Sequence, residues 1–218
     1  MDTVVSIQAR MESTRLPGKV LLPIGGTRVL DLVGQRSRDA SRVGDPVFAL
    51  GDNPPNTAVE EWCERTGNRY LVGPEDNLLE RHRRVADEIG ADVLVRVTGD
   101  CPFLPPGETD RVVAEHAGSD ARYTTNHVDG MPIGTALDVL DATLLAELAE
   151  AGERHPVRRL REHPESYATT FTGNPDWTAL SEAHVAVDTP ADYWTLTDAV
   201  DAVGKDPKAV AEWVAARD

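Results

Sequence analysis

Residues 8–19, with the sequence QARMESTRLPGK, gather cationic and hydroxyl side chains around a Pro-Gly turn. These side chains belong to Arg10, Arg15, Lys19, Ser13 and Thr14. Phosphate oxygens bind guanidinium, ammonium, hydroxyl and backbone N–H groups, and a glycine lets the backbone approach such a ligand closely. The segment therefore predicts a site for a polyanion such as a nucleoside triphosphate. It is neither the glycine-rich dinucleotide motif nor a P-loop, and the alternative is a solvated loop of mixed charge.

Two aspartates stand at the ends of apolar runs elsewhere in the chain. Asp100 ends the run over residues 92–100, and Asp188 ends the sequence HVAVD. Carboxylate oxygens are hard ligands that suit Mg²⁺ bound partly through substrate phosphates. The two side chains are therefore candidates for one shared metal site. The alternative is that each aspartate caps the helix that follows it.

An arginine-rich segment, RHPVRRLREH, covers residues 154–163 of an otherwise acidic chain. It could clamp an anionic sugar or a phosphate. It could equally form a solvated helical face whose arginines pair with Glu153, Glu162 and Glu165. We expect the histidines His82, His116 and His163 to lie at the surface, and nothing in the sequence has the Cys/His spacing of a zinc site. Cys101 is expected to be a small buried residue.

The spacing of apolar residues indicates an α/β fold in which strands and helices alternate. Strands are expected at residues 3–9, 46–51, 69–73 and 92–100, and later at 166–171 and 184–188. Helices are expected at residues 29–40, 57–65, 78–89, 105–117, 142–152, 189–203 and 206–217. Such alternation predicts a mostly parallel sheet flanked by helices. Ligands of these sheets bind beyond the carboxyl ends of the strands, where the loop over residues 8–19 and Asp100 are expected to meet.

Composition narrows the class of protein further. The net charge is −15 and the pI about 4.7, which argues against a nucleic-acid partner. The acidity is spread along the chain and arginine far outnumbers lysine, so adaptation to high salt is a hypothesis that activity measured up to molar KCl would test. Two cysteines suit a reducing cytoplasm. No apolar run has transmembrane length, and we expect no membrane association.

Three segments together resemble a known family. IQARMESTRLPGKVLLPIGG resembles an opening motif, VGPEDNLLERHRRVADEIGADVLVRVTGDCPFLPP a central block, and VDTPADY a late motif of the cytidylyltransferases related to CMP-KDO and CMP-acylneuraminate synthetases. The chain is most similar to their spore-coat-polysaccharide, SpsF-type branch. The resemblance implies a Rossmann-like nucleotidyltransferase fold. The chain length and the lack of an evident linker predict one domain over residues 1–218, with about 1–120 binding nucleotide and about 121–218 elaborating the acceptor side.

The resemblance also implies a reaction in which a hydroxyl of an acidic sugar attacks the α-phosphate of CTP and pyrophosphate leaves, in the synthesis of a surface glycan. It implies Mg²⁺ at Asp100 and Asp188, and catalytic roles for Lys19, Arg15 and Asp100. The implied nucleotide site comprises Gln8, Ala9, Arg10, Ser13, Arg15, Lys19, Thr98 and Gly99. The resemblance suggests a homodimer, and the cytoplasmic location is expected from the composition.

On the acceptor side the expected residues are Asn126, Asp138, Arg154 and His155, and here the sequence departs from the family. Ala136 and Arg154 replace acidic residues of the family pattern, and Glu12 stands where the family usually has Gly or Ala. Two alternatives follow. One is a nucleotidyltransferase that uses GTP or another nucleotide on a phosphorylated small molecule. The other is a nucleotide-binding regulatory module without turnover.

Overall fold

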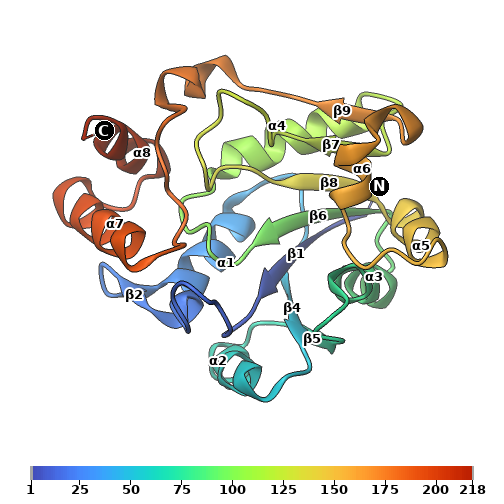
Figure 1. Cartoon of the computed structure of the whole chain (residues 1–218), viewed down its shortest axis with the longest axis horizontal. Coiled ribbons are helices and arrows are strands. Elements are labelled where there is room, and N and C mark those ends of the chain that lie inside the picture. Colours follow the sequence, from blue (N-terminus) through green and yellow to red (C-terminus); the bar gives the residue numbers. More distant parts are fainter. Residues whose placement is uncertain (1, 218) are drawn as a thin grey trace.

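The computed structural model describes residues 2–217. Seven strands form one twisted sheet in the order β5-β4-β1-β6-β8-β7-β9. Figure 1 shows the strands in this order, from β5 at one edge of the sheet to β9 at the other. Its strands are β1 (Thr3–Ala9), β4 (Val47–Gly51), β5 (Tyr70–Gly73), β6 (Val93–Thr98), β7 (Tyr123–Thr125), β8 (Asp138–Asp141) and β9 (Thr169–Phe171). A small hairpin of β2 (Pro23–Ile24) and β3 (Thr27–Arg28) lies apart from it.

The sheet is mostly parallel, as the sequence predicts. Strands β5, β4, β1 and β6 run parallel, whereas β8 runs antiparallel to both β6 and β7. The first four strands were expected, but β7 and β8 were not. Both are short, and β8 begins with the charged residue Asp138, so neither carries the apolar run that marks a buried parallel strand.

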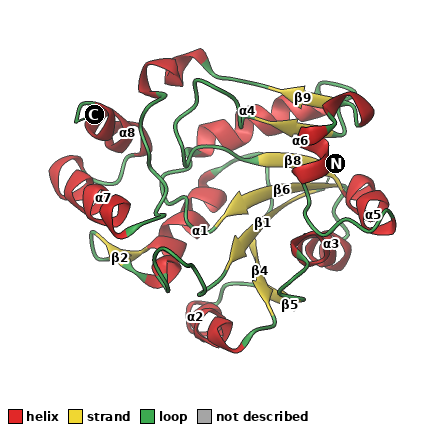
Figure 2. Cartoon of the chain, viewed as in Figure 1, coloured by secondary structure: helices red, strands yellow, loops and turns green. Residues whose placement is uncertain are grey.

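Helices cover both faces of the sheet, as Figure 2 shows. They are α1 (Val29–Asp39), α2 (Thr57–Thr66), α3 (Leu78–Ile89), α4 (Pro106–Ala117), α5 (Ala142–Glu150), α6 (Arg158–Glu162), α7 (Pro190–Val203) and α8 (Pro207–Ala215). Successive residues of β1 point to opposite faces, so Val4 packs with α3 and α5 whereas Val5 packs with α1 and α4. None of these helices is both long and apolar enough to cross a membrane, within residues 2–217.

The strand expected at residues 184–188 is wrong. Only His184 makes a β-bridge, to Ile133, and the rest of the segment is irregular. Val185 and Val187 are nevertheless fully buried, and their N–H groups donate to the carbonyls of Ile133 and Asp100 at 2.8 Å each. The alternating apolar residues of this segment therefore indicate that it is buried in the core. Burial alone does not distinguish a strand from an irregular segment.

Two of the three histidines expected at the surface are buried. His82 is fully buried and His116 is 3% exposed, while His163 lies at the surface as expected. Nδ1 of His82 lies 2.7 Å from the hydroxyl of Ser6, and His116 lies within hydrogen-bond distance of Thr124 and Asp141. A polar partner inside the fold stabilises each imidazole, and the sequence does not show these partners.

Candidate active site

The ends of β1 and β6 bring two predicted site segments together. The strands pair in parallel with Gln8 beside Thr98, and the N–H of Gly99 donates to the carbonyl of Gln8 at 2.8 Å. A Cβ atom at Gly99 would lie 2.8 Å from that carbonyl oxygen. The absence of a side chain at this position therefore lets Asp100 emerge directly beside the loop that follows β1.

A backbone turn closes the loop after β1. The N–H of Gly18 donates to the carbonyl of Met11 at 2.8 Å, and Gly18 has a φ of 74°, which favours glycine. Lys19 follows at once, at the start of a short 3-10 helix (Lys19–Leu21), and is only 8% exposed. The turn therefore directs the lysine side chain inward, toward the carboxyl ends of the strands.

Lys19 lies between the two aspartates expected to hold a metal. Its Nζ donates to Asp100 Oδ2 at 2.6 Å and to Asp188 Oδ1 at 2.9 Å. Burial lowers the pKa of Lys19, but the charges and hydrogen bonds of Asp100 and Asp188 outweigh it and leave the pKa raised. Lys19 is therefore a permanent cation at the centre of this group.

Asp188 reaches this point because two local contacts hold the backbone around it. The preceding residue, Val187, is hydrogen-bonded to the carbonyl of Asp100, and Thr189 and Asp192 form a capping box at the start of α7. Nη2 of Arg15 lies 2.9 Å from Asp188 Oδ1. Partial burial raises the pKa of Asp188, but Lys19 and Arg15 outweigh it and hold the pKa below its usual value.

A cavity of about 740 Å³ opens above this group and collects most of the predicted site. Its walls include eleven of the expected residues, namely Gln8, Ala9, Arg10, Ser13, Arg15, Lys19, Gly99, Asp100, Arg154, His155 and Asp188. Segments from both halves of the sequence thus line one space. Its size is within the range usual for small-molecule sites.

Three expected residues do not line the cavity. The hydroxyl of Thr98 lies 2.9 Å from the thiol of Cys101. Asn126 is fully buried, and its side chain bonds to the backbone of Thr135 and Leu137. Asp138 is 2% exposed and lies in ion pairs with arginines. Cys101 itself is 7% exposed, which confirms it as a buried residue.

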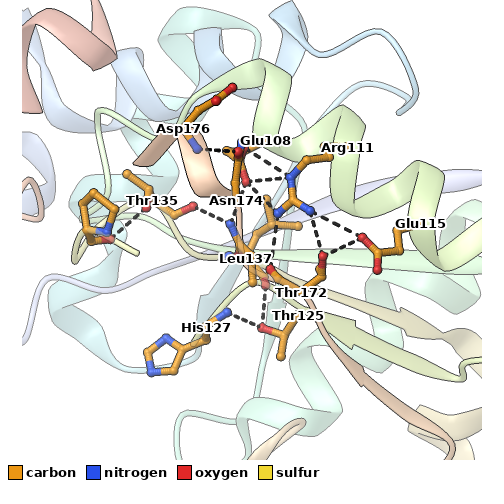
Figure 3. Close-up of polar contacts among 12 residues, drawn as sticks. Glu108, Arg111, Glu115, Thr125, His127, Thr135, Leu137, Thr172, Asn174 and Asp176 are labelled. Atoms are coloured by element: carbon orange, nitrogen blue, oxygen red, sulfur yellow. Dashed lines mark hydrogen bonds and ion pairs between the residues drawn. The ribbon is translucent and has the colours of Figure 1, made fainter. Parts of the chain in front are cut away.

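Asn126 belongs to a polar network centred on Glu108. Figure 3 shows the contacts of Glu108 and Arg111 within this network. Glu108 is 3% exposed and accepts hydrogen bonds from Arg111, Asn126 and Asn174. Arg111 also donates to the hydroxyl of Thr172 at 2.8 Å. This network ties the loop after β7 to α4 and to the segment after β9, and it lies outside the cavity.

Two arginines of the cavity wall were not predicted as site residues. Arg81 of α3 is 6% exposed. Within residues 2–217 the polar contacts of its guanidinium are long, at 3.4 Å to the carbonyl oxygen of Glu75 and 4.0 Å to the Glu75 carboxylate. Burial lowers the pKa of Arg81, and the nearby charge of Arg10 lowers it further. The signal in the sequence was an arginine on the apolar face of a helix, in register with Leu78 and Val85.

The second unpredicted arginine of the cavity wall is Arg158, in the arginine-rich segment of residues 154–163. The sequence offered two interpretations of this segment, a clamp for an anionic group or a solvated helical face, and the structure shows arginines of both kinds. Arg154 and Arg158 line the cavity. Arg159 pairs with Glu153 at 3.1 Å as part of a solvated face. Arg161 instead reaches a buried partner, Asp138, at 2.7 Å.

Glu12 does not enter the cavity. Its carboxylate accepts a hydrogen bond from the side chain of Asn53 at 2.8 Å, and it is absent from the residues that line the space. A carboxylate facing a triphosphate would repel it, and the contact with Asn53 holds this one aside. The departure from the family at this position is therefore compatible with binding of an anion.

Solved structures of nucleotidyltransferases share this fold. A cytidylyltransferase from Leptospira borgpetersenii serovar Hardjo-bovis superposes with a TM-score of 0.90 at 24% identity over 100% of this chain and 95% of that one. A CMP-KDO synthetase complexed with CTP superposes with a TM-score of 0.72 at 18% identity, over 93% of this chain and 99% of that one.

The sequence assigns the family within that class. The pattern of the cytidylyltransferase family matches residues 4–194. The spore coat polysaccharide biosynthesis protein SpsF of Bacillus subtilis is 31% identical over 94% of this chain and 89% of its own length. The chain belongs to the cytidylyltransferase family, which confirms the family and the Rossmann-like fold expected from its motifs.

Proposed function

We propose that this protein is a Mg²⁺-dependent cytidylyltransferase that transfers CMP from CTP to an acidic sugar, with release of pyrophosphate, for a surface glycan or polysaccharide. The observation that carries the proposal is Lys19, a buried cation between Asp100 and Asp188 at the floor of a cavity lined by further cations. The CTP complex of a structural relative and the similarity to SpsF support the choice of nucleotide and pathway.

The triphosphate is proposed to lie along the loop after β1. Arg10, Arg15 and Lys19 would neutralise its charge, and Ser13 would donate a neutral hydrogen bond. The acceptor hydroxyl oxygen forms a bond to the α-phosphorus while the bond from that phosphorus to the pyrophosphate oxygen breaks, and the hydroxyl proton passes to solvent water. Such a transfer needs positioning and charge neutralisation more than covalent help from the protein.

The side chains present fit a divalent cation. Carboxylate oxygens of Asp100 and Asp188 lie 2.6 and 2.9 Å from the same cationic nitrogen, so both can face one positive centre. Mg²⁺ prefers a few carboxylate oxygens and completes its shell with water and phosphate. When bound there, it would supply charge neutralisation for the phosphates. Lys19 would then turn toward a phosphate oxygen.

The acceptor is proposed to bind at the opposite wall, where Arg154, His155 and Arg158 line the cavity. Two guanidinium groups suit a carboxylate or a phosphate of the acceptor. These guanidinium groups also fit the second candidate function, a nucleotidyltransferase that uses another nucleotide on a phosphorylated small molecule.

Both cysteines are free and buried, which is compatible with the expected cytoplasmic location. The homodimer stays a prediction.

One assay tests the proposal. The purified protein is incubated with CTP, GTP, ATP or UTP, Mg²⁺, and a panel of sugar acids and sugar phosphates, and pyrophosphate is measured. CTP with a sugar acid is the expected productive pair, and EDTA or Asp100→Asn is expected to stop the reaction. Pyrophosphate from another nucleotide with a sugar phosphate would favour the second candidate. Binding of CTP without pyrophosphate from any pair would reject both.

A further inference from the structure

The orientation of the Gln8 side chain is fixed by an arginine behind the cavity. Its carboxamide oxygen accepts a hydrogen bond from Nε of Arg96 at 3.0 Å. A guanidinium has only donors, so the oxygen of Gln8 must face Arg96 and the NH₂ group must point the other way. Gln8 lines the cavity, and within residues 2–217 its NH₂ group has no protein partner. A pair of hydrogen-bond donors is therefore offered to a ligand.

Arg96 is itself held by a carboxylate that no ligand can reach. Arg96 on β6 lies opposite Asp138 on β8, and Nη1 donates to Asp138 Oδ2 at 2.6 Å. The two side chains are 10% and 3% exposed. Asp138 Oδ1 accepts from the hydroxyl of Tyr123 and from Arg161, at 2.7 Å each. Both oxygens of Asp138 are thus occupied by protein donors, so it acts on a ligand through these partners, and Arg96 is the one that contacts the cavity residue Gln8.

Burial raises the pKa of Asp138, but Arg96 and Arg161 outweigh it and keep the carboxyl ionised far below its usual pKa. Asp138 neutralises one of these two guanidinium groups, so the cluster remains positively charged. At the cavity wall, burial and then the charges of Arg96, Arg158 and Arg161 lower the pKa of His155. Gln8, His155 and Arg158 all line the cavity, and Arg96 lies directly behind Gln8, so these cations favour an anionic oxygen beside Gln8.

We propose that Asp138 is a positioning residue, which through Arg96 fixes the Gln8 carboxamide so that Gln8 donates to an anionic oxygen of the acceptor. The ligand class is a small molecule with a carboxylate or phosphate group. This inference rests on the proposed function for the identity of the acceptor, but not for the orientation of Gln8. The role differs from the direct acceptor contact expected for Asp138 from the sequence.

The orientation of Gln8 is tested without any ligand. Gln8→Glu keeps an acceptor toward Arg96 and adds charge, whereas Gln8→Met keeps the size and removes the acceptor. We expect the melting temperature of Gln8→Glu to equal or exceed that of the wild type, and that of Gln8→Met to fall below it. A fall in Gln8→Glu as large as that in Gln8→Met would overturn the orientation, whatever the enzyme does.

The role of the donor is tested with two probes, 3-deoxy-manno-octulosonate and glucose 1-phosphate, each with CTP and Mg²⁺. The variants Gln8→Glu and Asp138→Asn are expected to raise the KM of the preferred probe about tenfold, or its Kd by calorimetry if the wild type shows no turnover. For Asp138→Asn, which replaces a residue outside the cavity, kcat and CTP affinity should stay within about threefold of the wild type. The probe that responds distinguishes a carboxylate from a phosphate.

Glu108→Gln is the matched control, since it removes an equally buried carboxylate charge from an arginine partner outside the cavity (Figure 3). Like Asp138→Asn it should lower the melting temperature, but it should leave both affinities unchanged. If Asp138→Asn and Glu108→Gln changed the probe affinity equally, Asp138 would only stabilise the fold and would not position Gln8. Loss of CTP affinity in place of probe affinity, or a wild type that binds neither probe, would overturn the acceptor contact.

Discussion

Lys19 joins three parts of the chain that are distant in sequence. Its ammonium group contacts Asp100 and Asp188 and so links the loop after β1, the end of β6 and the start of α7. A compact point charge suits this place, because the same group can turn from two carboxylates to a phosphate oxygen. This explains why one of only three lysines in the chain stands here.

Replacement of Lys19 should therefore damage catalysis more than folding. Lys19→Ala leaves two carboxylates without their shared cation and removes a charge from the phosphate site. We expect kcat/KM for CTP to fall on the order of a hundredfold or more, as for loss of other groups that stabilise developing charge. The matched control is Lys208→Ala, an exposed lysine on α8. Activity of Lys19→Ala within threefold of the wild type, with an unchanged circular dichroism spectrum, would contradict the assignment.

Arg81 is expected to contribute to nucleotide binding. Its guanidinium is buried at the cavity wall with long contacts only, so a phosphate or a base carbonyl could satisfy it. We predict that Arg81→Met weakens CTP binding about tenfold in calorimetry, the effect of losing one charge-assisted hydrogen bond.

Arg84→Met provides the control for this substitution. Arg84 lies on the same helix, pairs with Glu80 at 3.0 Å and does not line the cavity. We expect its CTP affinity to match the wild type. Equal loss of affinity in both variants would indicate a general effect of charge, and no loss in Arg81→Met would remove Arg81 from the site.

At the scale of elements, the site depends on the close approach of β1 and β6. Gly99 allows this approach, because a Cβ atom there would lie 2.8 Å from the carbonyl oxygen of Gln8 and 3.0 Å from a methyl of Leu30. Neither atom can move without disturbing the strand or the core. Any side chain at this position should therefore displace Asp100 from Lys19.

Gly99→Ala is expected to lower the free energy of unfolding by about 1–3 kcal/mol, the usual range for overpacking, and to reduce activity. Urea unfolding measures the first effect and pyrophosphate release the second. Gly107→Ala is the control, since its new methyl group meets nothing within 4 Å in α4. That change should leave the protein as stable or more stable by up to about 1 kcal/mol. A fully stable Gly99→Ala variant would contradict the steric argument.

At the scale of the whole molecule, burial of histidines makes stability depend on pH. Burial is the first cause that lowers the pKa of His82, His116, His127 and His155, and the pKa of His155 falls from 6.5 to about 4. The unfolded chain therefore takes up protons first as the pH falls. The free energy of unfolding should be constant above about pH 6.5 and decrease from there toward pH 4.

Urea unfolding at a series of pH values tests this prediction. Each histidine that protonates only on unfolding adds a slope of up to about 1.4 kcal/mol per pH unit. Above about pH 5 the carboxylates contribute little, so histidines dominate the slope. His155→Gln should reduce this slope, because it removes one of the histidines whose pKa is lowered in the folded protein. A free energy of unfolding that stays constant from about pH 7.5 to about pH 5 would contradict the prediction.

The sequence by itself determined the elements whose signals are local. The strand of residues 3–9 and the helix of residues 78–89 were predicted with bounds that the structure confirms, and the Pro-Gly turn was predicted directly before Lys19. Local sterics and hydrogen bonds fix these features, so a short stretch of chain suffices to recognise them. The motif over residues 8–19 and its family followed from the same stretch.

Only the tertiary structure decided which side chains meet. Asp188 joins Asp100 at Lys19 although 169 residues separate it from that lysine. Asp138 faces Arg96 instead of the cavity. Arg81 lies in the cavity wall, although the sequence around it predicts only an ordinary helix. Such contacts depend on strand order and helix placement, which follow from burial of the whole core. The sequence thus determined the parts of the site, and packing of the sheet determined which of them face a ligand.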